Sequence, residues 1–207
     1  MSRPRCERCQ RPEPHCLCAL IPALDSRTRV LILQHRSEAG HALNTARLAA
    51  LGLRNAELRS GEVFDRQSLG PEAGRSYLLF PGEDAVALSS LAELDAPLRL
   101  IVPDGTWRKA RKLLHVNPWL ASLPRVVLPP GLQSRYRLRK APAPGALSTI
   151  EAIVTALNVL EQPARFDALL RPFEALIEGQ IEAMGALTYQ RNHATAEAGS
   201  AVQERRA

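Results

Sequence analysis

The chain has 207 residues, of which 45% are hydrophobic and 23% are charged, so it can bury a core and is not a disordered polymer. Its formal net charge of +6 favours a polyanionic partner such as nucleic acid, although a basic surface that only confers solubility gives the same count. No apolar run reaches membrane-spanning length, and the N-terminus leads into cysteines rather than an apolar signal segment. We therefore expect a cytoplasmic protein with no membrane partner.

All four cysteines lie in one short N-terminal stretch, as a Cys-x2-Cys pair followed by a Cys-x-Cys pair. Four thiolates suit tetrahedral zinc, and residues 1–24 are too few to hold themselves together by burial alone. We expect a small structural zinc knuckle, with two disulfides or free thiols as the alternatives and His15 as a candidate substitute ligand. Four protein ligands would leave no open position for a catalytic metal. The expected zinc ligands are Cys6, Cys9, Cys16 and Cys18.

Apolar runs of strand length alternate with helical patterns along the rest of the chain. The runs cover residues 29–34, 56–59, 77–80, 98–102 and 125–128, and the helical patterns cover 45–51, 85–94 and 106–114. This alternation predicts one α/β domain over residues 25–190, a mostly parallel sheet with helices on both faces. Two more helical patterns cover 148–160 and 166–187, the second with Pro172 as a candidate kink. Residues 191–207 carry no apolar stripe, so we expect a disordered tail.

Two of the expected strands end in loops that carry proline and glycine side by side. These loops are Phe80-Pro81-Gly82 and Pro103-Asp104-Gly105-Thr106-Trp107. The carboxyl ends of parallel strands meet at one edge of a sheet, where such loops form a ligand-binding crevice. Asp104 offers a carboxylate there, Gly105 permits close approach of a ligand, and Thr106 can cap the following helix. The alternative is two ordinary strand-to-helix turns, with a helix cap and a core tryptophan.

Two basic stretches follow that junction. One is a face of the helix that starts there, and the other is an irregular run in which arginines alternate with apolar or aromatic residues. Both can contact nucleic-acid phosphates, with a tyrosine stacking on a base, or be solvated surface. Farther on, Ser148-x-x-Glu151 is a capping box, and the helix N-terminus that it opens can also bind a carboxylate or phosphate. The candidate RNA contacts are Arg108, Arg111, Lys112, Arg135, Tyr136, Arg137, Arg139 and Lys140.

With these motifs in order, the sequence resembles the DTW-domain family, named for its Asp-x-Thr-Trp motif, which here is Asp104-Gly105-Thr106-Trp107. The resemblance extends from the cysteine knuckle to the last apolar helix. The other matching pieces are the four cysteines, Gln34-His35 with Glu38 and Asn44-Thr45, Phe80-Pro81, Asn117-Pro118, Tyr136-x-Leu138-Arg139-Lys140 and Leu147-Ser148-Thr149-Ile150-Glu151-Ala152. The family pattern often has proline after Gln-His, where this chain has Arg36.

The resemblance implies a tRNA-uridine aminocarboxypropyltransferase of the bacterial type. Such an enzyme transfers the 3-amino-3-carboxypropyl group of S-adenosylmethionine to N3 of a uridine in tRNA, at position 47 of the variable loop, and releases methylthioadenosine. The resemblance also implies a SPOUT-like fold whose sheet ends in a trefoil knot around the donor. Nothing in composition or periodicity indicates a knot.

On this resemblance, the protein must orient donor and uridine and remove a weakly acidic imide proton, since the sulfonium already activates the donor. Asp104 is the candidate general base, or else the anchor of the donor's α-amino group. Trp107 would stack on the target base or line the donor pocket, and Thr106 would cap its helix and contact the methionyl part. The residues expected to hold the donor are Leu79, Phe80, Pro81, Gly82, Pro103, Asp104, Leu147, Ser148 and Thr149.

Two other functions stay open from the sequence. A SPOUT-like RNA methyltransferase would use the same donor but release adenosylhomocysteine. A non-enzymatic, zinc-dependent RNA-binding protein would bind no donor, and its Asp104 stretch would be only a turn. The products and the binding of S-adenosylmethionine separate the three.

Overall fold

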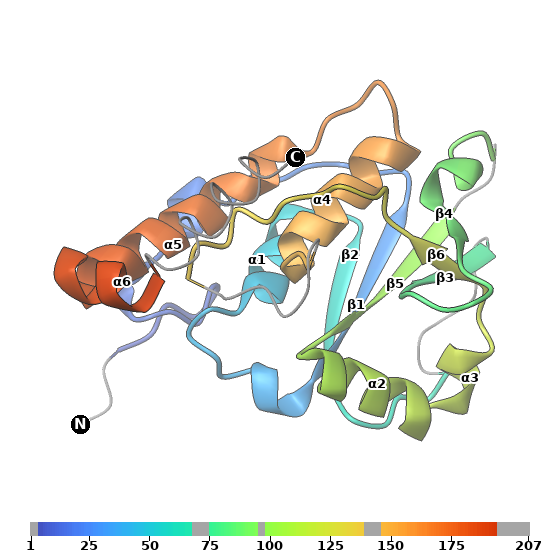
Figure 1. The fold of residues 1–207 in the computed structure, drawn as a ribbon, viewed down its shortest axis with the longest axis horizontal. Coiled ribbons are helices and arrows are strands. Elements are labelled where there is room, and N and C mark those ends of the chain that lie inside the picture. The colour runs from blue at the N-terminus through green and yellow to red at the C-terminus, as the bar shows by residue number, and fades with distance from the viewer. Residues whose placement is uncertain (1–3, 68–74, 95–97, 139–145, 194–207) are drawn as a thin grey trace, which may run out of the picture.

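The computed structural model describes residues 4–67, 75–94, 98–138 and 146–193. In this part of the chain, six strands form a sheet in the order β2-β1-β5-β3-β6-β4, and each neighbouring pair is parallel (Figure 1). The strands are β1 (Arg29–His35), β2 (Ala56–Gly61), β3 (Arg75–Leu79), β4 (Val86–Ala87), β5 (Leu98–Asp104) and β6 (Arg125–Val127). The predicted α/β class with a parallel sheet is therefore confirmed.

Helices cover both faces of this sheet, as predicted. Helices α1, α4 and α5 lie together on one side, whereas α2 and α3 lie on the other (Figure 1). The α-helices are α1 (Thr45–Gly52), α2 (Trp107–Val116), α3 (Pro118–Ala121), α4 (Thr149–Leu160), α5 (Leu170–Met184) and α6 (Ala186–His193). Short 3-10 turns cover Glu13–His15, Cys18–Leu20, Arg36–Glu38, Leu88–Leu91 and Asp167–Leu169. None of the helices described combines the length and apolar character needed to cross a bilayer.

Alternation along the central strands divides the core between the two faces. In β1, Val30 and Ile32 belong to the large cluster under α1, α4 and α5, while Leu31 and Leu33 belong to the smaller cluster under α2 and α3. All four side chains are almost completely buried. A strand buried on both faces needs a continuous apolar run, and each such side chain contributes about 1.5–3 kcal/mol on burial.

The helix predicted over residues 85–94 is wrong. Val86–Ala87 instead form β4, the edge strand that pairs with β6, and Leu88–Leu91 form a 3-10 turn. Leu88 and Leu91 are both buried, so the three-residue spacing that indicated a helix is the spacing of a single 3-10 turn. Pairing with a strand about forty residues away overrides the local pattern.

The helix boundaries otherwise follow the signals in the sequence. The side chain of Asn44 accepts from the backbone of Arg47 to cap α1, and the Ser148–Glu151 capping box opens α4. Pro172 does not kink a long helix, because α5 begins at Leu170 and the proline lies in its first turn. Backbone N–H groups in a first turn have no acceptor within the helix, so the missing N–H of proline costs nothing there. Helix α6 runs past the expected domain end at residue 190, and residues 194–207 of the expected tail lie outside the described residues.

The cysteine knuckle packs into the same core as the sheet. Cys9, Leu17 and Ile21 are buried in the large cluster with α1, α4 and α5. The guanidinium of Arg11 donates to the backbone oxygen of Ala42 at 2.8 Å, which ties the knuckle to the loop before α1. The knuckle is thus joined to the main domain by apolar packing and by a hydrogen bond.

Candidate active site

Asp104 is the last residue of β5 and lies beside Gln34 of β1 in the sheet register. Asp104 is only 9% exposed, and both oxygens of its carboxylate accept hydrogen bonds. The amide of Gln34 donates to Oδ2 at 2.8 Å, and the hydroxyl of Thr149, the first residue of α4, donates to Oδ1. Hydrogen bonds to a carboxylate are charge-assisted, so these two donors fix its orientation and stabilise its negative charge.

Gln34 connects this carboxylate to the start of α1. Its Nε2 also donates to Oδ1 of Asn44 at 3.0 Å, so each of its two N–H groups can have an acceptor. The amide of Asn44 donates in turn to the backbone oxygens of Glu38 and Ala39. Because Gln34 is only 1% exposed, the ends of β1 and β5 and the start of α1 are held together by a buried polar network.

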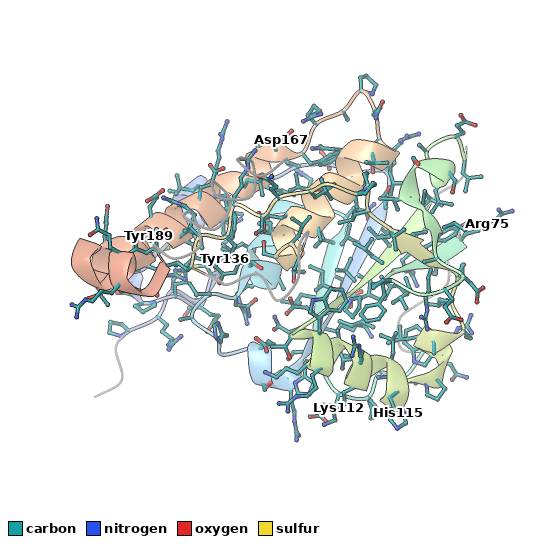
Figure 2. The ribbon with its side chains drawn as sticks, in the orientation of Figure 1. Arg75, Lys112, His115, Tyr136, Asp167 and Tyr189 are labelled. Atoms are coloured by element: carbon teal, nitrogen blue, oxygen red, sulfur yellow. The ribbon has the colours of Figure 1, made fainter. Side chains whose placement is uncertain are left out.

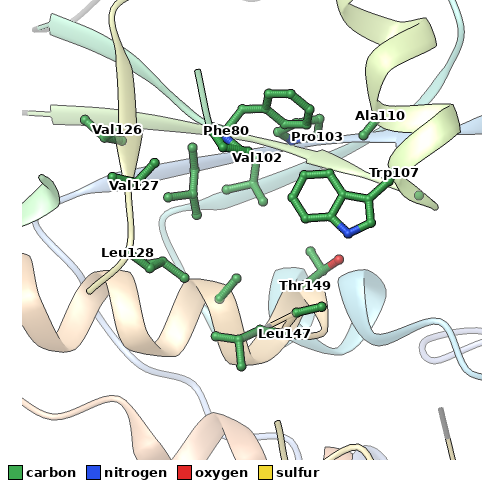
Figure 3. A pocket seen from close by; sticks show the side chains of 15 residues that line it. Phe80, Val102, Pro103, Trp107, Ala110, Val126, Val127, Leu128, Leu147 and Thr149 are labelled. Carbon is green, nitrogen blue, oxygen red and sulfur yellow. The ribbon is translucent and has the colours of Figure 1, made fainter. Parts of the chain in front are cut away.

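An apolar pocket of about 280 Å³ opens beside the Asp104 junction (Figure 3). Trp107 and Phe80 form one wall, with ring centroids 5.6 Å apart and planes tilted by 58°. Trp107 is 38% exposed, so part of its indole remains available to a ligand. Across the pocket lie Leu147 and Thr149, at the start of α4 (Figure 3). A flat, largely apolar ligand fits this combination of aromatic and aliphatic walls.

A second cavity, of about 390 Å³, adjoins the first and is lined mainly by residues with polar side chains, so we call it the polar cavity. The two share Gly105 and Thr149 in their linings. Lys109 of α2 lines the polar cavity, and its ammonium lies 2.6 Å from a carboxylate oxygen of Glu38. The polar side chains around the cavity are Gln34, Glu38, His41, Asn44, Thr45, Asp104, Thr106, Lys109, Tyr136, Ser148 and Thr149. The crevice at the ends of β1, β3 and β5 is therefore bipartite, with one apolar half and one charged half.

The structure brings most of the expected donor-binding residues into these two spaces. Leu79, Phe80, Pro81, Pro103, Leu147 and Thr149 line the apolar pocket, and Asp104, Ser148 and Thr149 line the polar cavity. Gly82 is in neither lining, and a side chain at that position would meet the side chain of Arg125. The hydroxyl of Thr106 accepts from the backbone of Lys109 at 3.4 Å, so it caps α2 as predicted, while Trp107 lies in the apolar wall.

Sequence reasoning assigned no donor-binding role to four polar residues of the charged half, although it placed Gln34 and Glu38 in a polar cluster at a ligand-facing strand end and expected Asn44 to cap a helix. The four residues are Gln34, Glu38, Asn44 and Lys109. Gln34 could be placed at a ligand-facing strand end, because the carboxyl ends of neighbouring parallel strands meet at one edge of a sheet. Lys109 could not, because its pairing with Glu38 joins elements 71 residues apart in the chain.

The expected RNA contacts that the structure describes belong to two separate groups. Arg108, Arg111 and Lys112 are exposed on α2, and Lys112 projects away from the sheet (Figure 2). The Lys112 ammonium is 2.8 Å from a carboxylate oxygen of Glu62, and this hydrogen bond lowers the pKa of Glu62. The same carboxylate also pairs with Arg36. This group is thus a basic surface with one acidic residue among its cations.

The later basic run is an irregular segment docked on α4 and α5. Arg135 and Arg137 pair with Glu174 and Glu178 of α5, and the ring of Tyr136 packs edge-on against Phe173, with centroids 5.6 Å apart. The arginines are exposed, whereas the tyrosine is half-buried and borders the polar cavity. Arg139 and Lys140 lie outside the described residues.

Glu151 holds that segment in place, a role the capping box alone did not indicate. Its carboxylate accepts from the backbone N–H of Ser148 at 2.8 Å, as the box requires. It also accepts from the hydroxyl of Ser134 at 2.9 Å and from the backbone N–H of Arg135 at 2.6 Å. One buried side chain therefore fixes both the start of α4 and the path of the basic segment.

The four cysteine sulfurs lie within 4.8 Å of one another and form no disulfide. Sγ of Cys6 is 3.6 Å from that of Cys18, and Sγ of Cys9 is 3.8 Å from that of Cys16. Sulfurs bound at about 2.3 Å to a tetrahedral zinc lie about 3.8 Å apart, so the donor set and its spacing fit zinc. His15 is not part of the group.

The thiols also have unequal affinities for protons. Backbone N–H groups of Cys9 and Arg8 lower the pKa of the Cys6 thiol to about 6. Burial, followed by hydrogen bonds with neighbouring thiols, raises the pKa of Cys18 to about 12. Four thiolates this close repel one another, so a cation is needed to ionise all of them.

A sequence model of the DTW domain matches residues 3–181, so the chain belongs to the DTW-domain family. The chain is 31% identical over 205 residues to tRNA-uridine aminocarboxypropyltransferase 2 of Macaca fascicularis, covering 92% of this chain and 68% of that protein. It is 32% identical over 201 residues to the protein of the same name in Drosophila melanogaster, covering 91% and 79%. It is 29% identical over 190 residues to tRNA-uridine aminocarboxypropyltransferase A of Arabidopsis thaliana, covering 75% and 72%. No solved structure shows significant similarity to the chain.

Proposed function

We propose that this protein transfers the 3-amino-3-carboxypropyl group of S-adenosylmethionine to N3 of a uridine in tRNA. The observation that carries the proposal is the bipartite crevice at Asp104, in a chain whose relatives bear the name of this activity. The apolar pocket suits the adenosine of the donor, and the adjoining charged cavity suits its amino-acid arm. A basic exterior suits an RNA acceptor.

The reaction forms a bond between N3 and the γ-carbon of the donor and breaks the bond from that carbon to sulfur. Methylthioadenosine leaves as a neutral thioether, and the N3 proton is lost. Because the sulfonium is already a good leaving group, the protein contributes orientation and electrostatic stabilisation. Asp104, which lines the polar cavity, would serve for proton removal or for anchoring the donor.

Three neighbours of Asp104 would complete the site. Thr149 orients the carboxylate and lies in both linings, so it would touch the donor at the junction. Trp107 would lie flat on the adenine or the uracil. Thr106 would hold the start of α2 and approach the methionyl part.

The tRNA would lie across the exposed basic residues of α2 and the segment at residues 135–140. Surface ion pairs are worth little, so Arg135 and Arg137 can exchange their glutamate partners for phosphates. If so, Arg137→Ala should weaken tRNA binding and make the salt dependence shallower by roughly one unit for the lost phosphate contact. An unchanged salt slope would contradict that contact.

Zinc would be held by the four cysteines, where it supplies the positive charge that lets all four bind as thiolates. Its role would be structural, with all four positions taken by protein. We also propose the SPOUT-like relation, with a trefoil knot at the end of the sheet, and a cytoplasmic location. An experimental structure in which the chain passes through no loop would contradict the knot.

The decisive experiment is incubation of the protein with unmodified tRNA and S-adenosylmethionine labelled in the aminocarboxypropyl part. We expect label in a tRNA uridine, at position 47 on the family resemblance, with one methylthioadenosine released per transfer. Adenosylhomocysteine would instead identify a methyltransferase. No donor binding by calorimetry would identify an RNA-binding protein without this activity.

A further inference from the structure

The polar cavity contains opposite charges at defined places, and the proposed function does not yet use them all. Asp104 and Glu38 supply carboxylates, and Lys109 supplies an ammonium. The side chains of Lys109 and Glu38 are only 28% and 19% exposed, so this pair forms the wall of the cavity rather than the outer surface. A partly buried pair is screened by solvent far less than a surface pair.

The arm of S-adenosylmethionine carries opposite charges as well, an α-ammonium and an α-carboxylate on one carbon. We propose that the polar cavity binds this arm, with Asp104 as the partner of the ammonium and Lys109 as the partner of the carboxylate. The inference rests on the proposed function and deepens it. It assigns Asp104 to anchoring rather than to proton removal, and gives a donor-binding role to Lys109.

The hydrogen bonds of Asp104 support the anchoring role. Gln34 and Thr149 each donate to one of its oxygens, so the carboxylate is held in one orientation in the lining of the polar cavity, where a ligand ammonium would meet a fixed negative charge. Donors on a carboxylate make it a poorer proton acceptor and a better fixed anion. The N3 proton of the uridine then leaves to solvent water.

Lys109 is placed to reach the other end of the arm. Its ammonium has three N–H groups, one of which is directed at Glu38, and the remaining two can serve a ligand carboxylate. Glu38 fixes the lysine, since without this partner the flexible side chain would lose rotamer entropy on binding. Gly105 lies between Lys109 and the apolar pocket, so the arm can cross the junction while the adenosine stays beside Trp107.

The test is calorimetry without tRNA on full-length protein, with two ligands that share the adenosine but differ in the arm. S-adenosylmethionine carries the arm, whereas methylthioadenosine lacks it. We expect Asp104→Asn and Lys109→Gln each to weaken binding of S-adenosylmethionine by roughly tenfold or more and to leave methylthioadenosine within about twofold of wild type. His115→Gln, an exposed change on the same helix as Lys109, should leave both affinities unchanged.

Two results would overturn the inference. In one, either variant binds S-adenosylmethionine as tightly as wild type does. In the other, a substitution weakens the binding of both ligands by the same factor. The outcomes also separate this inference from the proposed function. Wild-type protein that binds no donor refutes the proposed function, whereas donor binding that is indifferent to both substitutions refutes only the assignment of the arm. If the two variants discriminate between the ligands as expected but the wild-type protein transfers no group to tRNA, only the proposed transfer is refuted.

Discussion

Gly105 lines both the apolar pocket and the polar cavity, and its backbone conformation limits which residues this position tolerates. Its φ of +151° is a conformation that residues with side chains rarely adopt. A Cβ at this position would lie 3.0 Å from Cβ of Lys109 and 3.6 Å from that of His35. The sequence predicted a close approach here, and the structure adds that α2 itself makes one.

We therefore expect Gly105→Ala to destabilise the fold by about 1–3 kcal/mol, because the backbone is strained and Lys109 must shift. Donor binding should weaken as well, since Lys109, which must shift, lines the polar cavity. Urea denaturation and calorimetry measure the two effects. Gly179→Ala in α5 is the matched control: nothing lies within 4 Å of its Cβ position, so a gain of up to about 1 kcal/mol is expected. Equal stabilities of the two variants would contradict the strain.

At this scale the sequence predicts the position of the candidate site residues better than the contacts that hold them. Asp104, Thr106 and Trp107 follow from a strand end, a turn and a cap, all local signals. The partners of Asp104 come from β1 and α4, 70 and 45 residues away in the chain. Only the sheet order places them together, and local periodicity does not specify that order.

The start of α4 is the element that joins the crevice to the basic segment. Glu151, 5% exposed, accepts from Ser148 within the capping box and from Ser134 and Arg135 outside it. The box is visible in the sequence because its two residues are three positions apart. The docking of the basic segment is not, because it depends on acids of α5 that lie 39 and 41 residues beyond their arginines.

Glu151→Gln should destabilise the protein by about 1–3 kcal/mol, because one amide oxygen cannot replace a carboxylate that serves several donors. Amide hydrogen exchange should also accelerate around Arg135, as its backbone N–H loses a charged acceptor. Glu174→Gln is the control, an exposed ion pair whose loss should cost at most about 1 kcal/mol. If the exposed substitution costs as much as the buried one, Glu151 is not the residue that holds the segment.

Most elements follow from periodicity, and the single wrong helix shows where periodicity fails. Strands β1 and β5 are long apolar runs buried on both faces, and the sequence predicts both of them as strands. The stretch at residues 85–94 has apolar residues at three-residue intervals, which a helix and a 3-10 turn share. The edge pairing of Val86 with Val126 decides the outcome, and that contact is non-local.

At the scale of the whole molecule, the knuckle and the α/β domain share one core. Cys9 is at once an expected zinc ligand and a buried member of the large apolar cluster, alongside Leu17 and Ile21. Arg11 ties the knuckle to Ala42, in the loop that carries His41 and Leu43 on the rim of the polar cavity. Loss of the metal should therefore be felt both in global stability and at the donor site.

We expect one zinc per chain by elemental analysis, and a fall in Tm of roughly 5 °C or more when a chelator removes it, because apolar contacts of the knuckle loosen and about 1 kcal/mol corresponds to 2–4 °C at this size. Binding of S-adenosylmethionine should weaken in parallel. Arg11→Gln separates the two effects: it keeps all four cysteines but removes the guanidinium that bonds Ala42, so zinc should stay bound while donor affinity falls. A protein that loses zinc without a change in Tm would show that the shared core does not depend on the metal.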